Sequence, residues 1–301
     1  MTLVHFEGCL LGLALGDALG ARHEGGIAER VLWRLIGTTR HSQMRWTDDT
    51  QMSLDIAESL AATGTLDPDD LAARFARSYR WSRGYGPGVA KLLKRIAHGA
   101  DWRQANRAVF SEGSFGNGGA MRAPVIGMFY CRNPDKLADA ARLAAMVTHA
   151  HPLGKEGAVL LACATAQALD SQQPYEILRS AAAHCKLEPF TVRLEIAAQW
   201  LHAGEEPGAR EVARRLGNGV AASESCVTAV YLALRFMGRP FMEMLVFIAK
   251  VGGDVDTLGA MAGAVWGAAN GVAGLPQDQL ARLEQRERLT AAAAALHARV
   301  F

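Results

Sequence analysis

The chain has 301 residues, of which 50% are hydrophobic and 21% charged, so it can bury a large core. This composition excludes an intrinsically disordered polymer. Its formal net charge is only +2, and its 32 basic and 30 acidic residues form no basic stripe, so we expect no nucleic-acid partner. Small anions and proteins are the expected partners.

Features that would mark a domain boundary, such as a Pro/Gly/Ser-rich linker or a run of like charge, are missing, which predicts a single domain over residues 1–301. The apolar stretch Gly8–Leu15 is far shorter than the roughly 20 residues of a membrane span, and no basic region precedes it. We therefore expect neither a membrane helix nor a signal peptide. Five scattered cysteines without a C-x-x-C pair predict buried thiols and a cytoplasmic location.

Apolar residues recur mostly at helical spacing, and Ala, Leu, Arg and Glu dominate, which predicts an all-α fold built as a compact bundle of many helices. The predicted helices are 3–19, 48–62, 67–80, 87–98, 117–130, 134–148, 153–170, 190–203, 223–237, 240–250, 257–270 and 276–298.

Two of the predicted helices carry glycine at every fourth position. These are Gly8, Gly12, Gly16 and Gly20 in the first, and Gly259, Gly263 and Gly267 in the second. Such spacing leaves one bare stripe along a helix. Because each interior glycine costs about 0.5 to 1 kcal/mol relative to alanine, the stripes indicate close approach of another backbone or of a ligand.

Acidic clusters stand at the starts of two helices. One is Asp48-Asp49, flanked by Thr47 and Thr50, and the other is Gly253-Asp254-Val255-Asp256-Thr257. A single aspartate at such a position is usually a helix cap. Two clusters exceed what capping needs, and four carboxylates with threonine hydroxyls form an all-oxygen ligand set. That set suits Mg²⁺ or Mn²⁺, and two such ions would balance four carboxylates.

A glycine-rich segment, Gly113-Ser114-Phe115-Gly116-Asn117-Gly118-Gly119, precedes a predicted helix. Backbone N–H groups in such a loop can bind phosphate oxygens. The segment matches neither the Walker A pattern nor a dinucleotide fingerprint. Arg122, just beyond it, has two readings of equal weight, as an anion contact or as a structural ion pair.

Taken in order, these segments resemble the ADP-ribosylglycohydrolase family. The resemblance spans about residues 5 to 270 and rests on five segments: Gly16-Asp17-Ala18-Leu19-Gly20 with Glu24, Thr47-Asp48-Asp49-Thr50, Gly113 to Arg122, Thr148-His149, and Gly253 to Thr257. The family includes hydrolases of ADP-ribosyl-arginine and ADP-ribosyl-serine. The resemblance implies an all-α domain with a dinuclear metal site in a cleft.

The resemblance assigns roles to particular residues. The implied ligands of two Mg²⁺ or Mn²⁺ ions are Thr47, Asp48, Asp49, Asp254, Asp256 and Thr257. Glu24, beside the metals, would contact the ribose or activate water, so Glu24, Asp48 and Asp49 are the implied catalytic residues. The loop Gly113–Gly119 would hold the diphosphate, with Phe115 near the adenosine and His149 at the ribose or phosphate. His149 also has a purely structural reading.

One position departs from the family pattern: Val255 stands where a threonine is usual. The side chain between two ligands need not face the metal, so ligation is unaffected and only a hydrogen bond from that side chain is in question.

The implied partners are ADP-ribose and an ADP-ribosylated protein. Arginine is the favoured acceptor, serine is the alternative, and Tyr85, with Asp101 less surely, is the candidate to line the cleft mouth, although Asp101 also reads as a helix cap. Two other functions stay open from the residues: a two-metal phosphoesterase, and a non-catalytic ADP-ribose binder or structural relative.

Overall fold

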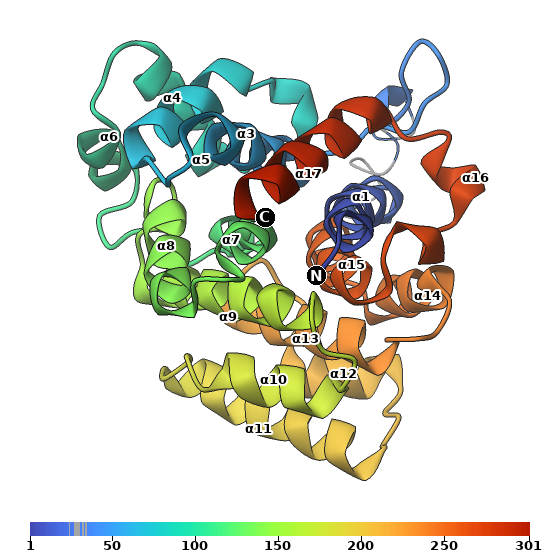
Figure 1. Cartoon of the computed structure of the whole chain (residues 1–301). Coiled ribbons are helices and arrows are strands. Elements are labelled where there is room, and N and C mark those ends of the chain that lie inside the picture. The colour runs from blue at the N-terminus through green and yellow to red at the C-terminus, as the bar shows by residue number, and fades with distance from the viewer. Residues whose placement is uncertain (24, 27–30, 32, 34) are drawn as a thin grey trace.

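The computed structural model describes residues 1–23, 25–26, 31, 33 and 35–301 of the chain (Figure 1). Within these residues the regular secondary structure is helical, and β pairing is limited to isolated bridges, which confirms the all-α prediction. The helices are α1 (Leu3–Gly20), α3 (Asp48–Thr63), α4 (Pro68–Ser78), η1 (Trp81–Arg83), α5 (Pro87–Ala97), α6 (Trp102–Val109), η2 (Asn117–Gly119), α7 (Ala123–Tyr130), α8 (Pro134–Met146), α9 (Pro152–Ala168), α10 (Pro174–Ala182), α11 (Glu188–Ala203), α12 (Ala209–Leu216), α13 (Ala222–Arg235), α14 (Phe241–Val251), α15 (Val255–Asn270), η3 (Val272–Gly274), α16 (Gln277–Leu280) and α17 (Arg286–Val300).

Three helices were not predicted, namely α6, α10 and α12, which are 8 or 9 residues long. At that length few core-facing positions repeat; α12, for example, buries only Val212 and Leu216. A periodic signal needs a longer window, so these segments did not stand out.

Two predicted helices are divided. The predicted helix 276–298 is split into α16 and α17, because Gln285 takes a left-handed conformation (φ 51°) that no α-helix can continue through. The predicted helix 117–130 is a 3-10 turn, η2, followed by α7, which begins only at Ala123.

The two glycine-striped helices, α1 and α15, pack against each other with their backbones in contact. A Cβ atom added at Gly8 would lie 2.4 Å from the carbonyl oxygen of Gly267, and one added at Gly16 would lie 2.0 Å from that of Gly259. The residue numbers rise along one helix as they fall along the other, so the pair is antiparallel. Of the two predicted reasons for the stripes, the structure shows the approach of another backbone.

Helix α1, with 18 residues, is long and apolar enough by length and composition to cross a membrane, which the count of Gly8–Leu15 alone did not indicate. In the fold, 72% of this segment is buried. It packs on α15, α17 and α3, and Figure 1 shows it inside the bundle. These contacts are those of a core helix.

Helix α9 forms a second centre of packing. It contacts α7 and α8 on one side and α10, α13 and α15 on the others. Helices α4, α5 and α6 gather at one end of the molecule, whereas α10 to α12 lie at the other (Figure 1). The C-terminal α17 returns to cover α1 and α3. The N-termini of α3 and α15 and the C-terminus of α1 meet between these parts.

The contact between α1 and α15 predicts that Gly12→Ala destabilises the protein strongly. A Cβ at Gly12 would lie 2.4 Å from the carbonyl oxygen of Gly263, so the helices would have to move apart. We expect a loss of about 3 kcal/mol in the free energy of unfolding, measured by urea denaturation. Gly208→Ala is the control, because nothing lies within 4 Å of its added Cβ, and should change stability by less than about 1 kcal/mol. Similar losses in the two variants would contradict the close-packing explanation.

Candidate functional site

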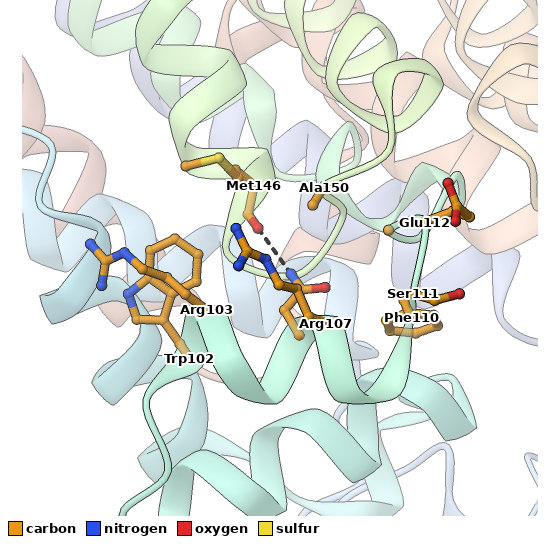
Figure 2. A pocket seen from close by; sticks show the side chains of 10 residues that line it. Trp102, Arg103, Arg107, Phe110, Ser111, Glu112, Met146 and Ala150 are labelled. Atoms are coloured by element: carbon orange, nitrogen blue, oxygen red, sulfur yellow. Dashed lines mark hydrogen bonds between the residues drawn. The ribbon is translucent and has the colours of Figure 1, made fainter.

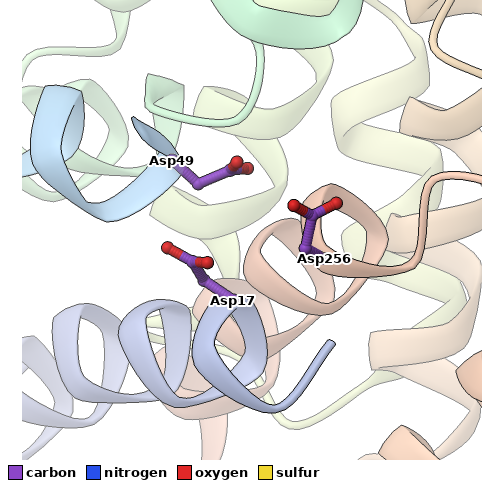
Figure 3. A group of neighbouring side chains, drawn as sticks. All are labelled: Asp17, Asp49 and Asp256. Atoms are coloured by element: carbon purple, nitrogen blue, oxygen red, sulfur yellow. The ribbon is translucent and has the colours of Figure 1, made fainter. Parts of the chain in front are cut away.

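Three buried carboxylates converge where three helices meet. Asp17 comes from the last turn of α1, Asp49 from the first turn of α3 and Asp256 from the first turn of α15. One oxygen of each lies within 4.8 Å of the others, and Figure 3 shows the three side chains pointing toward one another. All three side chains are at most 5% exposed. Burial leaves their mutual repulsion poorly screened by water.

Asp17 positions α3. Its carboxylate accepts hydrogen bonds from the backbone N–H of Thr47, at 3.0 Å, and of Thr50, at 3.1 Å, and from the hydroxyl of Thr50 at 2.5 Å. These two N–H groups stand at the start of α3, where no intrahelical acceptor is available. Asp17 thus docks the N-terminus of α3 on α1 and places Asp49 beside itself.

The cluster favours a bound cation. Burial raises the pKa of Asp17 to about 6, although its hydrogen bonds to Thr50 and Thr47 act in the opposite direction. Burial, and then the neighbouring carboxylates, raise the pKa of Asp49 well above its ordinary value. Its Oδ1 atom is buried and accepts no hydrogen bond from the described residues. An orphaned oxygen in an all-carboxylate cluster fits a hard divalent ion such as Mg²⁺ or Mn²⁺.

The predicted threonine ligands border this cluster. The Thr47 hydroxyl lies 3.0 Å from Asp49 Oδ2, and the Thr257 hydroxyl lies 3.5 Å from the same oxygen. Both side chains are buried, whereas Asp48, half-buried, lines the open cleft. Four of the six predicted ligands therefore stand at the cluster or next to it: Thr47, Asp49, Asp256 and Thr257. A fifth, Asp48, lines the cleft.

Asp254 lies beside the group of three. It is the N-cap residue of α15, and its Oδ2 accepts a 2.6 Å hydrogen bond from the side-chain amide of Asn117. That amide also donates to the Ser225 hydroxyl. Asn117 was predicted as part of a diphosphate loop, and the structure shows that it joins this loop to the second acidic cluster.

The segment before Asp48 is anchored by a buried ion pair between Arg83 and Glu284. Arg83 donates to the carbonyl oxygen of Trp46 and stacks over its ring at 3.6 Å, while the Glu284 carboxylate accepts from the Trp46 N–H. These contacts hold the chain at Trp46, one residue before Thr47. The C-terminal part of the chain thereby supports the acidic cluster.

A cleft of about 300 Å³ opens above the carboxylates. Of the predicted metal ligands, four line it: Asp48, Asp49, Asp256 and Thr257. The other lining residues are Met52, Gly84, Gly86, Pro87, Gly88, Val89, Phe110, Ser114, Gly116, Asn117, Gly118, Met121, His149 and Val220. The cleft therefore brings the glycine-rich loop and the acidic clusters to one cavity, as the sequence predicted.

The glycine-rich loop differs from the predicted phosphate cradle. The N–H of Gly116 donates to the Ser114 hydroxyl, and the N–H of Asn117 donates to the carbonyl oxygen of Val220. These two groups are already paired. Gly113 lines a neighbouring pocket instead of the cleft, and Gly119 packs against Ala145, so the loop meets the cleft through Ser114, Gly116, Asn117 and Gly118.

His149 lies in the wall of the cleft, only 5% exposed, beside Gly116 and Gly118. Burial, and then the charge of Arg122, lower the pKa of its imidazole to about 3, so His149 is neutral at physiological pH. His151, two residues on, caps α9 through its Nδ1 atom, which accepts from the Leu153 N–H.

Other predicted site residues lie elsewhere. The Tyr85 side chain is buried against Tyr79, and its neighbours Gly84 and Gly86 line the cleft in its place. Phe115 is 54% exposed and packs edge-on against His151. Glu24 lies outside the described residues. Asp101, the other candidate for the cleft mouth, caps α6 by accepting from the backbone N–H groups of Arg103 and Gln104.

A second pocket, of about 290 Å³, adjoins the cleft at Phe110 (Figure 2). It is lined by Trp102, Arg103, Asn106, Arg107, Phe110, Ser111, Glu112, Gly113, Met146 and Ala150. Its lining contains one acid, Glu112, and no group of converging carboxylates, so it lacks the set of oxygen donors found in the cleft.

Asp17 belongs to one of the segments that resemble the family, but the sequence predicts no role for it. Its signal was an acidic residue within an otherwise apolar, glycine-striped helix, a type of residue that is almost never buried without a partner.

The fold and the cleft define an all-helical protein whose acidic cluster and glycine-rich loop share one cavity. A family model described as ADP-ribosylglycohydrolase matches residues 3–300. The chain belongs to the ADP-ribosylglycohydrolase family and is a glycohydrolase.

Known relatives are similar to this chain over nearly its whole length. "ADP-ribosylhydrolase ARH3" of Homo sapiens is 34% identical, with 100% of this chain and 94% of the relative covered. "ADP-ribosyl-[dinitrogen reductase] glycohydrolase" of Rhodospirillum rubrum is 30% identical, with 93% and 90% covered. A solved structure titled "ADP-ribosylglycohydrolase-related protein complex" has a TM-score of 0.69 at 30% identity and covers 99% of each chain.

The ion pair of Arg83 predicts that Glu284→Gln destabilises the protein by about 3 kcal/mol, because a buried guanidinium is left without its counter-charge. Glutamine keeps an acceptor for the Trp46 N–H, so the charge is the main change. Glu58→Gln is the control: its pair with Arg288 is partly exposed and should contribute less than about 1 kcal/mol. Urea unfolding measures both, and equal effects would show that the buried pair does not anchor the Trp46 segment.

Asp55, a buried residue of α3, predicts a pH effect. Burial raises its pKa to about 6 from 3.8, despite hydrogen bonds from Ser78 and Gln51. The folded state therefore binds this proton more tightly than the unfolded state. The stabilisation of the folded state by the protonated Asp55 carboxyl is therefore fully present below about pH 4, and it is lost as the pH rises through about 6.

Asp55→Asn removes this titration. Relative to the parent protein it should be more stable by about 2 to 3 kcal/mol at pH 8, and the difference should shrink toward pH 4. Thermal melts of both proteins between pH 4 and pH 8 measure it. A difference that stays constant with pH would contradict the raised pKa.

Proposed function

We propose that this protein hydrolyses the bond between the distal ribose of ADP-ribose and a modified protein acceptor, with two Mg²⁺ or Mn²⁺ ions as cofactors. The convergence of Asp17, Asp49 and Asp256 beneath a cleft that also contains the glycine-rich loop carries the proposal. Family membership supports the glycohydrolase reaction over the phosphoesterase alternative. The presence of both acidic clusters of the motif in this chain speaks against a purely structural relative.

Each group of residues in the cleft has its own role in the proposed reaction. Asp49 and Asp256, with Thr47, Asp48, Asp254 and Thr257 as predicted, would hold the ions. When bound, the ions would polarise a water and orient the ribose hydroxyls. Asp17 holds Asp49 in place through the α3 N-terminus. Ser114 and Gly118 would contact the diphosphate, and His149 would donate a hydrogen bond from the cleft wall. Glu24 is proposed to assist proton transfer as the oxocarbenium-like centre develops.

For the acceptor we propose arginine, with the contacts revised. Tyr85 is buried and Asp101 is a helix cap, so neither supplies the acid or aromatic face expected at the cleft mouth. Among the cleft residues, the half-buried Asp48 is the acid best placed to face a guanidinium cation, with one carboxylate oxygen toward the guanidinium and the other toward an ion. The name of the Rhodospirillum rubrum relative refers to a modified protein, which supports a protein acceptor in general.

Metal dependence tests the reaction. Chelation followed by verified metal removal should abolish release of ADP-ribose from a modified protein, and Mg²⁺ or Mn²⁺ should restore it. Asp49→Asn should lower turnover by more than about 100-fold, because even the loss of an outer-shell partner lowers metal affinity or activity by about 10- to 100-fold. Asp139→Asn, which changes an exposed carboxylate, is the control. Full activity in the metal-free protein would rule out the metal-dependent mechanism.

The acceptor is tested with peptides mono-ADP-ribosylated on arginine or on serine. Free ADP-ribose is followed for each at equal concentration, and the arginine peptide is expected to react faster. A serine rate equal to or above the arginine rate would overturn the arginine proposal and leave the hydrolase proposal intact. Simple phosphate esters serve as the negative control, since the phosphoesterase alternative requires their cleavage.

A further inference from the structure

A buried arginine stands behind the cleft without a carboxylate partner among the described residues. Arg122 is fully buried, and it donates to the carbonyl oxygens of Gly118, at 2.7 Å, and Ala144, at 3.1 Å, and to the hydroxyl oxygen of Thr148, at 2.8 Å. Its ring neighbour is Phe75, at 4.8 Å. A guanidinium has donors only, so at each of these contacts the oxygen must accept.

The contact with Arg122 determines how the Thr148 hydroxyl is oriented. Thr148 is fully buried, and its oxygen already accepts from Arg122. In the part of the chain that the structure describes, the one other side-chain atom recorded at hydrogen-bond distance is His149 Nδ1, at 2.8 Å. A buried hydroxyl proton without an acceptor is unfavourable, so Thr148 donates to Nδ1. Nδ1 therefore carries no proton.

The other imidazole nitrogen of His149 lies against the glycine-rich loop, whose residues Gly116 and Gly118 line the cleft. A Cβ added at Gly118 would lie 2.9 Å from Nε2, and one at Gly116 would lie 3.3 Å from it, so this nitrogen borders the glycine-rich loop. Only 5% of His149 is exposed, and the hydrogen bonds recorded for its ring are all at Nδ1. Burial and the nearby Arg122 keep the ring neutral by lowering its pKa to about 3. A neutral ring with a bare Nδ1 has its proton on Nε2.

We propose that Thr148 is a positioning residue which, backed by Arg122, holds His149 in the Nε2–H form so that it donates to an acceptor oxygen of ADP-ribose in the cleft. The ligand identity rests on the proposed function, whereas the form of the ring does not. In the opposite form, Nε2 would present a lone pair to a phosphate or ribose oxygen, and two acceptors would face each other. The two hydrogen bonds from Arg122 to Thr148 and from Thr148 to His149, here called the relay, therefore determine whether His149 attracts the ligand or repels it.

The first test observes the ring directly. Nitrogen-15 labelling of the nine histidines allows the two imidazole nitrogens of each to be distinguished by NMR in the full-length protein without substrate. His149→Gln identifies the His149 signals by their loss. At pH 7 we expect a protonated Nε2 and an unprotonated Nδ1. A protonated Nδ1, or a charged ring, would overturn the proposal.

The second test removes the relay. Thr148→Val has the same shape without the hydroxyl, and we expect its His149 to become a mixture of the two forms and its Kd for ADP-ribose to rise about 5- to 10-fold, the loss of one hydrogen bond. Thr148→Ser restores the hydroxyl and should rescue both readouts. Thr165→Val is the matched control, since Thr165 is a buried threonine whose hydroxyl donates to the Leu161 carbonyl oxygen, and it should change neither.

The two readouts separate this proposal from the proposed function. If Thr148→Val weakens binding while the His149 signals stay those of the parent, the relay is overturned. If Thr148→Val does not fold, the spectrum of the parent protein still decides. A parent protein that shows the Nε2–H form but binds no ADP-ribose in calorimetry would overturn the proposed ligand and leave the relay standing.

Discussion

The antiparallel contact of α1 and α15 is the constraint on which the rest of the molecule depends. Backbone meets backbone along both glycine stripes, so the relative position of the two helices is determined to within a fraction of a side chain. This contact brings the last turn of α1 beside the first turn of α15, and with them Asp17 and Asp256. Larger residues in either stripe would separate the two carboxylates before they altered the rest of the bundle.

The site is assembled from helix ends that are joined by side chains rather than by local sequence. Asp17 attaches the start of α3, and Asn117 attaches the start of α15 to the glycine-rich loop. Arg122 ties that loop to Thr148. Each link satisfies a buried polar group, so the links that orient the cleft also contribute to stability. Removing one of them leaves a buried donor or acceptor unpaired and displaces a functional group at the same time.

Much of the fold was predictable because long helices repeat their apolar positions many times, and the acidic clusters were predictable because they exceed what helix capping requires. The role of Asp17 was not predictable from pattern, since the backbone N–H groups that it accepts from lie 30 and 33 residues away. Tyr85 shows the opposite failure: the sequence placed it at the cleft mouth, yet its ring is buried against Tyr79. The break between α16 and α17 depends on the left-handed backbone of Gln285, and no neighbouring glycine indicated it in the sequence.

The order in which the chain is synthesised determines when the carboxylate cluster can form. Its members come from the first, the second and the last part of the chain, at positions 17, 49 and 256. While the chain is still being translated, the glycine stripe of α1 has no partner, and Asp17 and Asp49 have no third carboxylate. The three carboxylates therefore cannot come together until α15 has left the ribosome, so a prematurely terminated chain exposes the apolar α1 and lacks Asp256.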